Sequence, residues 1–253
     1  MTGMPKHLVV TSVTVVFVLC AAHRAHAQST WSDHARVSLN AGFQQPSTTF
    51  TATAHPPVYE STATLTTNYS VSKGALFDGE VILRVSGGFG IDIGLSAFSR
   101  SEVAPIAGTI PHPALGSAPR PISGTSGSLE RSEIVGRLDA AYVMSAGLVD
   151  VAVSAGPSFF TVNQDLVTNV TFAESPSFDR VTFTGATVAN AGATKLGFNA
   201  GVDVGVKLSK NIGVGAMVRY SHASMVFPLA NAPGGVTADA GGAHVGGGVR
   251  VYF

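Results

Sequence analysis

Apolar residues that alternate with polar ones constrain the fold of this chain more than any other feature. The clearest case is KLGFNAGVDVGVKL at residues 195–208, where almost every second residue is a large apolar one. A period of two is typical of a β-strand with one apolar face. Similar segments occur at residues 36–44, 77–86, 90–100, 133–142, 149–160, 212–224 and 244–253. We therefore predict eight strands, each able to supply the ~9–11 residues of a tilted membrane-spanning strand.

The composition indicates how the apolar faces are covered. Only 12% of the residues are charged, against about 25% in soluble domains. After residue 27, no apolar stretch reaches the roughly 20 residues of a membrane helix. A closed barrel is the other structure that satisfies its backbone in lipid. Lys and Arg number 15, as do Asp and Glu, and this balance argues against a nucleic-acid partner.

The connections between the predicted strands favour a barrel over a soluble sandwich. Short joins at residues 87–90, 145–148 and 209–211 alternate with long connections at about 45–76, 101–132, 163–194 and 227–242. Short turns at one end and long loops at the other are typical of outer-membrane barrels. We predict an all-β fold, a transmembrane up-and-down antiparallel barrel of eight strands, with both termini at the periplasmic end. The alternation at residues 63–71 predicts that the first of the four extracellular loops continues as a β-ribbon.

The N-terminus has the features of a secretory signal peptide. A basic start at residues 6–7 precedes an apolar run at 8–22 and the small-residue site Ala25-His26-Ala27. We predict removal of residues 1–27 and a mature barrel domain, 28–253, that begins at Gln28. Cys20 is the one cysteine and lies in the removed part. The mature chain is therefore expected to contain no disulfide and no cysteine-based metal site.

The plan of the chain resembles the small eight-stranded outer-membrane barrels of the OmpA, OmpX and opacity-protein type. The resemblance covers residues 35–253 and includes an end on Phe253, with Val251 and Val249 at alternate positions before it. In that family such an ending is the signal read by the outer-membrane assembly machinery. The resemblance implies export to the cell outer membrane, contact with its lipids and a monomer. No periplasmic domain is expected.

Charged residues fall on the faces opposite the apolar ones. On the lipid side, Arg or Lys at mid-bilayer would cost about 2–4 kcal/mol. We therefore expect these side chains to form an ionic network inside a narrow lumen, which eight strands leave just wide enough for side chains to fill. The expected members are Arg36, Asp78, Glu80, Arg84, Asp92, Arg100, Glu133, Arg137, Asp139, Asp150, Lys195, Asp203, Lys207, Arg219 and Arg250. A conducting pore is the alternative.

One stretch could carry chemistry. RYSHAS at residues 219–224 is similar to the R-x-x-H-x-S stretch of outer-membrane lipid A deacylases, which implies His222 as base and Ser224 as nucleophile. That family has Asn directly after the Ser and a Glu about a dozen residues later. Here Met225 follows, no Glu comes after it, and Asp239 is expected in a loop at the wrong interval.

The loops are the other place where function is expected. They are rich in Ser, Thr, Pro and Gly, and His112 has no second metal ligand at a fixed spacing. No cofactor motif or metal site is expected. We predict a non-catalytic outer-membrane barrel that serves membrane integrity or surface interaction through its loops, with a loop ligand left open. The alternatives are a lipid A deacylase-like esterase and a small pore or ligand carrier.

Overall fold

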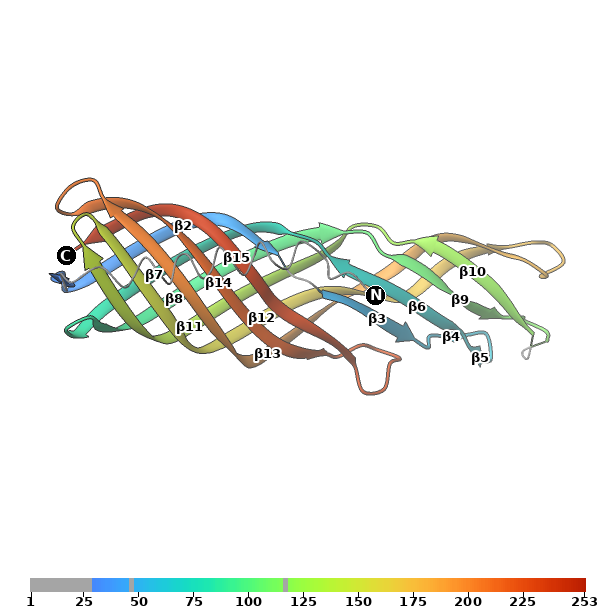
Figure 1. Cartoon of the computed structure of the whole chain (residues 1–253). Helices are drawn as coiled ribbons and strands as arrows, with labels where there is room; N and C mark the ends of the chain where they lie inside the picture. Colours follow the sequence, from blue (N-terminus) through green and yellow to red (C-terminus); the bar gives the residue numbers. More distant parts are fainter. Residues whose placement is uncertain (1–28, 46–47, 116–117) are drawn as a thin grey trace, which may run out of the picture.

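The computed structural model describes residues 29–45, 48–115 and 118–253, and its long strands close into a ring. The eight strands of the ring are β2 (Ala35–Gln45), β7 (Gly74–Ser86), β8 (Phe89–Glu102), β11 (Leu129–Ala146), β12 (Val149–Glu174), β13 (Val181–Lys207), β14 (Ile212–Phe227) and β15 (Val236–Tyr252). Each pairs antiparallel with the next, and β15 pairs with β2 to complete the circle. The predicted eight-stranded up-and-down barrel is confirmed (Figure 1).

Three tight turns lie at the end of the barrel that holds the C-terminus (Figure 1). They join β7 to β8, β11 to β12, and β13 to β14. Gly87 and Gly147 sit in two of them with φ of 57° and 62°, a backbone conformation that glycine adopts without a steric penalty. The tight turns fall where the sequence predicts short connections.

The outer wall of the barrel is an apolar belt. In β8 the outward residues from Phe89 to Ala97 are all apolar and exposed, and Ser99 is the first polar one. Nine residues at ~3.3 Å each and a tilt of about 40° span about 23 Å, close to the ~25 Å apolar band of membrane barrels. Exposed aromatic side chains mark the two edges of the belt: Phe43, Phe77, Phe159, Phe198 and Tyr220 at one, Phe89, Tyr142 and Phe253 at the other.

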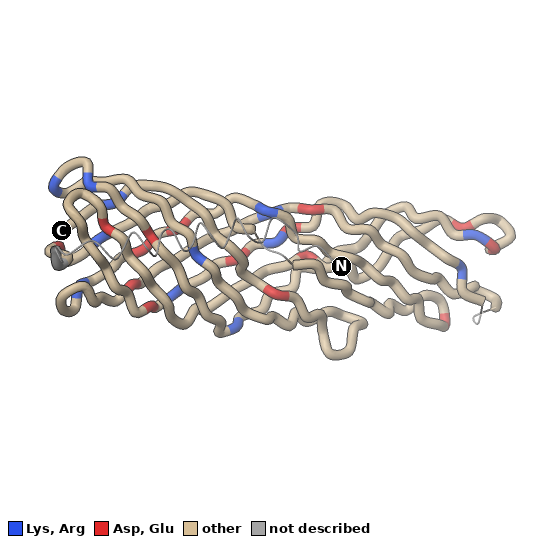
Figure 2. Tube along the Cα trace, viewed as in Figure 1, with Lys and Arg blue, Asp and Glu red and all other residues tan. Residues whose placement is uncertain are grey.

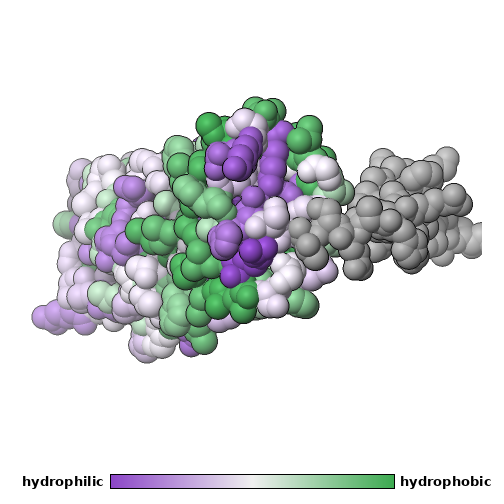
Figure 3. Space-filling view, turned by 90° about the vertical axis from the view of Figure 1, so that its left-hand side faces the viewer, coloured by the Kyte–Doolittle hydropathy of each residue, from purple (hydrophilic) through white to green (hydrophobic). Residues whose placement is uncertain are grey.

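Hydrophobic side chains gather on the barrel wall in the space-filling view of the C-terminal end (Figure 3). Exposed apolar side chains are expected on a surface that faces lipid. An apolar belt of this size in contact with water would promote aggregation. In the part of the chain that the structure describes, no helix is both long and apolar enough to span a membrane.

The first three of the four long connections are largely strands, beyond the single ribbon that the sequence predicts. A second sheet has the order β10-β9-β6-β3, built from β3 (Thr48–Ala54), β6 (Thr64–Val71), β9 (Pro105–Pro111) and β10 (Pro119–Thr125). Pairing of β3 with β6 confirms the ribbon expected at residues 63–71. The small pair β4 (Pro57–Val58) and β5 (Ser61–Thr62) lies between them. Strands β12 and β13 continue past the barrel wall beside this sheet (Figure 1).

We call the part beyond the lipid belt, residues 48–71, 105–125 and 165–190, the projection. Its strands alternate like those of the barrel, but the apolar side chains point inward. Phe50, Leu65, Ile106 and Ile122 of the second sheet belong to one buried cluster with Leu166 of β12. Phe50 stacks on Tyr69 with ring centroids 4.6 Å apart. The projection is therefore a packed β-structure with a buried apolar core.

Candidate functional site

The lumen holds most of the charged residues that the sequence assigns to it. Eleven of the fifteen are buried: Arg36, Asp78, Glu80, Asp92, Glu133, Arg137, Asp139, Asp150, Asp203, Arg219 and Arg250. They come from all eight barrel strands, because alternate residues of every strand point inward. Charged residues are concentrated along the barrel and at the far tip, and few lie between (Figure 2).

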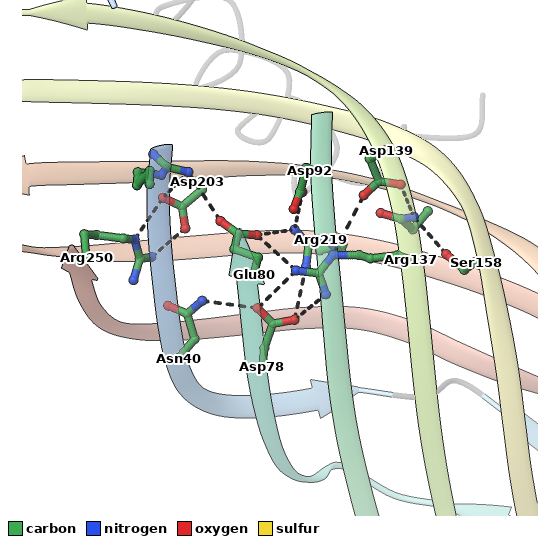
Figure 4. A network of polar contacts seen from close by, with 12 residues as sticks. Asn40, Asp78, Glu80, Asp92, Arg137, Asp139, Ser158, Asp203, Arg219 and Arg250 are labelled. Carbon is green, nitrogen blue, oxygen red and sulfur yellow. Dashed lines mark hydrogen bonds and ion pairs between the residues drawn. The ribbon is translucent and has the colours of Figure 1, made fainter. Parts of the chain in front are cut away.

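Two carboxylates of β7 form the centre of the network (Figure 4). Asp78 accepts hydrogen bonds from Arg137 Nη1 at 2.6 Å and Arg219 Nη1 at 3.2 Å. Glu80 accepts from Arg137 Nη2 at 3.0 Å and Arg219 Nη2 at 2.9 Å. The two guanidinium groups thus each bridge the same pair of anions. Asn40 of β2 adds a neutral donor to Asp78 at 3.2 Å.

The network continues toward the C-terminal end through Arg36. Arg36 Nη2 lies 3.3 Å from Glu80 and 3.2 Å from Asp203 of β13. Arg250 of β15 donates through Nε to Asp203 at 3.1 Å, and its Nη2 contacts the second carboxylate oxygen. Strands that are not neighbours in the ring, such as β2 and β13, are therefore linked across the lumen. A lumen crossed in this way at several levels is filled rather than open.

Space for one of these guanidinium groups depends on a glycine. A Cβ atom on Gly94 would lie 2.2 Å from Cζ of Arg137. Since Gly94 faces Arg137 across the β8–β11 pair, any side chain there would displace the arginine from Asp78 and Glu80.

A second polar cluster lies near the projection and includes a residue that the sequence analysis misses. Arg131 is buried and donates through Nε to Glu133 at 2.7 Å and through Nη1 to Gln164 at 3.2 Å. Gln44 donates to Glu133 at 2.9 Å. Arg131 escaped prediction because it precedes the expected strand 133–142, in a segment expected to be a loop.

Buried apolar side chains fill the lumen around this second cluster. Inward residues of the barrel strands at the projection end include Leu76, Phe98, Val135, Phe160 and Met225, and all belong to the same cluster as the core of the projection. The lumen is therefore ionic along the lipid belt and apolar where the barrel meets the projection.

Three of the predicted network residues, Arg84, Arg100 and Lys195, lie elsewhere, which corrects those assignments. Arg100 is exposed and pairs with Glu102 at 2.9 Å, because it lies where β8 leaves the ring. Lys195 is exposed on β13, at a level where β13 has separated from β14. Arg84 is half-buried and donates to a backbone carbonyl at 2.7 Å. Lys207 is half-buried near the short turns and keeps a contact with the predicted network, because it lies 3.8 Å from Asp150 as well as 2.6 Å from Asp33.

The opposite mouth of the barrel is closed by a residue that the sequence analysis does not single out. β1 (Ser29–Thr30) pairs with Met144 and Ser145 of β11. Trp31 follows and is 1% exposed, packed with Ile82 and Val143. Its carbonyl accepts the hydrogen bond from Arg84. A lone tryptophan before the first strand has no periodic signal, so the pattern of the sequence could not reveal this role.

The candidate esterase residues lie on the outer wall. His222 is half-buried and Ser224 is exposed on β14, as parity predicts. Asp239 is on β15 rather than in a loop, directly opposite Ser224 in the strand register. Among the side-chain hydrogen bonds of the described residues, none joins these three. The ring of His222 instead packs beside Phe198 at 5.8 Å. The three residue types are brought together without the hydrogen bonds of a catalytic triad.

The predicted assembly signal lies on the wall of the closing strand. Val249 and Phe253 are exposed and Val251 is half-exposed. The carbonyl of Phe253 accepts from the backbone N–H of His34 at 2.6 Å. The exposed position of Phe253 is typical of an aromatic residue at a membrane interface. The role of this C-terminal segment in assembly stays a prediction.

The tip of the projection is tied together by Arg120. This buried side chain donates to Glu174 at 2.6 Å, to the Phe178 carbonyl at 2.9 Å and to the Pro111 carbonyl at 2.6 Å. Burial opposes ionisation of Glu174, but hydrogen bonds from Tyr59 and Arg120 hold the pKa of its carboxyl below the usual value. His112 contacts the Phe178 ring at 6.5 Å between centroids. No group of three or more His, Cys, Asp or Glu side chains suited to a metal ion occurs among the described residues.

Comparisons with known proteins find likeness in fold alone. Neisserial surface protein A shares 13% identity over 87% of this chain and 97% of its own, with a TM-score of 0.41. Ail, the attachment invasion locus protein of Yersinia pestis, shares 10% over 86% and 99%, with a TM-score of 0.35. The outer membrane protease OmpT from Escherichia coli shares 7% over 90% and 100%, with a TM-score of 0.43. No family model and no curated protein sequence matches the chain.

Proposed function

We propose that the protein is a non-catalytic, monomeric barrel of the cell outer membrane that presents the projection at the cell surface. In this proposal the chain is exported by a signal peptide, inserted by the outer-membrane assembly machinery and embedded in outer-membrane lipids. The projection then serves surface interaction or membrane integrity. The single observation that supports the proposal most is the filled lumen, in which Arg137 and Arg219 bridge Asp78 and Glu80 across the barrel.

A filled lumen argues against transport. An eight-stranded barrel has room inside for side chains alone, and here those side chains are paired ions below an apolar layer. Trp31 closes the other mouth. The part of the molecule with access to ligands is therefore its outer surface.

Planar-bilayer recordings of the purified protein test this proposal. We expect no steady conductance steps. Large, ion-selective currents from the parent protein would show an open lumen and contradict the proposal.

A second experiment concerns the projection. A variant in which residues 49–70 and 105–125 are each replaced by short turns should still insert, because the lipid belt and the short turns are intact. Loss of adhesion or of serum survival in cells that express this variant, at equal surface amounts, would assign the surface role to the projection. Unchanged adhesion and survival would contradict it.

A further inference from the structure

The outward face of the second sheet is an uncharged array of small side chains, all of them polar except Ala107. Its members are exposed or half-buried and alternate with the buried core residues of the same strands. They are Thr49, Thr51, Thr53, Thr64, Thr66, Asn68, Ser70, Ala107, Thr109, Ser123 and Thr125. Strand register aligns them in rows, as in Thr53, Thr66, Ala107 and Ser123. The face lacks the charges that cover most protein surfaces.

Two shallow hollows lie side by side across this face. Asn68 and Pro105 line both, so the hollows form one groove that runs across the strands. The groove occurs where β6 and β9 separate, since their pairing ends at Thr67 and Ile106. The next pair would join Asn68 to Pro105, and Pro105 has no N–H that could continue the hydrogen bonds between β6 and β9.

The central polar group of the groove is held in a fixed orientation. Thr51 Oγ1 donates to Asn68 Oδ1 at 2.8 Å. Because the carbonyl oxygen of the amide is occupied in this way, its two N–H donors remain for a ligand. Ser70 and Thr125 add hydroxyl groups on either side.

We propose that this groove binds neutral sugar residues of glycolipids in the surrounding outer leaflet. Sugars offer hydroxyl groups that both donate and accept, and C–H faces that pack on small apolar surfaces. The groove presents hydroxyl and amide groups beside the Pro105 ring and contains no charged side chain. A phosphate or sulfate group would find no cation there to pair with.

Other occupants fit the groove less well. A peptide that adds as a strand must run alongside another strand over several residues, but the groove runs across the strands. A second copy of the chain would need a buried apolar centre, and no large exposed apolar side chain lines the groove.

The position of the groove indicates which sugars can reach it. Ser70 precedes Phe77, at the edge of the lipid belt, by seven residues. At ~3.3 Å per residue and a tilt of about 40°, the groove lies within about 20 Å of the apolar band. This is the level of the saccharide part of outer-leaflet glycolipids, so the inference rests on the proposed location in the outer membrane.

The test uses the full chain in nanodiscs and two forms of lipopolysaccharide from the expression strain, one with and one without its neutral polysaccharide. Amide hydrogen exchange at residues 48–54 and 64–71 is measured in each. We expect slower exchange with the polysaccharide-bearing form. The free polysaccharide should bind in calorimetry, about tenfold more weakly to Asn68→Ala and severalfold more weakly to Thr51→Val.

Thr53→Val is the matched control, because Thr53 shares the strand and face of Thr51 but does not line the groove. It should bind within about twofold of the parent. Equal loss in Thr51→Val and Thr53→Val, or no binding by the parent, would overturn the site. Binding of free polysaccharide without protection by the membrane-embedded form would overturn the glycolipid as source. A conducting lumen, by contrast, would refute the proposed function and leave this site unaffected.

Discussion

Replacement of Arg137 by Met tests whether the lumen network is a unit of stability. The substitution keeps an unbranched side chain of similar length but removes the hydrogen bonds to Asp78 at 2.6 and 3.3 Å and to Glu80 at 3.0 Å. Asp78 and Glu80 are buried, so each would lose one of its cationic partners without gaining water. Removing one member of a buried ion pair typically costs about 3–5 kcal/mol.

Arg219 moderates that loss, since it also contacts both carboxylates. We therefore expect the lower end of the range, about 3 kcal/mol. Urea unfolding of the protein in lipid vesicles, followed by heat-modifiable mobility in electrophoresis, measures the free energy of unfolding. Insertion itself should persist, because the lipid belt is unchanged.

Arg100→Met is the matched control. Arg100 forms an exposed pair with Glu102, and exposed pairs contribute about 0–1 kcal/mol. The double variant Arg137→Met with Asp78→Asn should recover part of the loss, because it removes an uncompensated buried charge. If Arg137→Met unfolds within about 1 kcal/mol of the parent, the lumen is wet and the reasoning from buried ion pairs is wrong.

Four further results are expected. The mature protein should fractionate with outer membranes and begin at Gln28; unaggregated recovery in the soluble periplasm would contradict the location. Deletion of Phe253 should impair insertion because an interfacial anchor is lost, and normal amounts of folded, heat-modifiable protein would argue otherwise. His222→Ala and Ser224→Ala should leave the mass of lipid A unchanged, whereas loss of an acyl chain in the parent alone would establish an esterase. The depressed pKa of Glu174 stabilises the tip above the unfolded pKa of about 4.3, so the protection factors for hydrogen exchange at the tip, corrected for the intrinsic rate at each pH, should decrease as pH falls through the lower folded value; pH-independent protection factors would refute this.

The sequence predicts the barrel well because lipid imposes one rule on every strand. Outward residues must be apolar along the whole belt, so apolar residues alternate with others in all eight strand sequences. This alternation can be recognised without knowledge of which strands pair. The same parity places Asp78, Glu80 and Arg137 inside. It fails at strand ends, where Arg100 keeps inward parity and yet reaches water. It also fails for Arg131, which continues a strand into a segment rich in loop-forming residues.

Partners inside the lumen cannot be predicted in the same way. Arg36 and Asp203 come from strands that are not neighbours in the ring, and their contact depends on the stagger of the strands around the barrel. The projection was underestimated because Thr, Ser, Pro and Gly are typical of loops. In β3 and β6 the same Thr residues occupy the outward face of a sheet whose inward face is apolar.

The position of Trp31 links the start of the chain to a part of the ring distant from the closing strands. β1 pairs with β11, while β2, only a few residues later in the chain, closes the ring against β15. The segment between them therefore crosses the mouth of the barrel at the end with the short turns, and the indole packs against β7, β11 and β12, which lie close together in the ring. Because Trp31 is the single tryptophan of the chain, its fluorescence should report when this segment docks on that arc of the wall, an event separate from the pairing of β15 with β2.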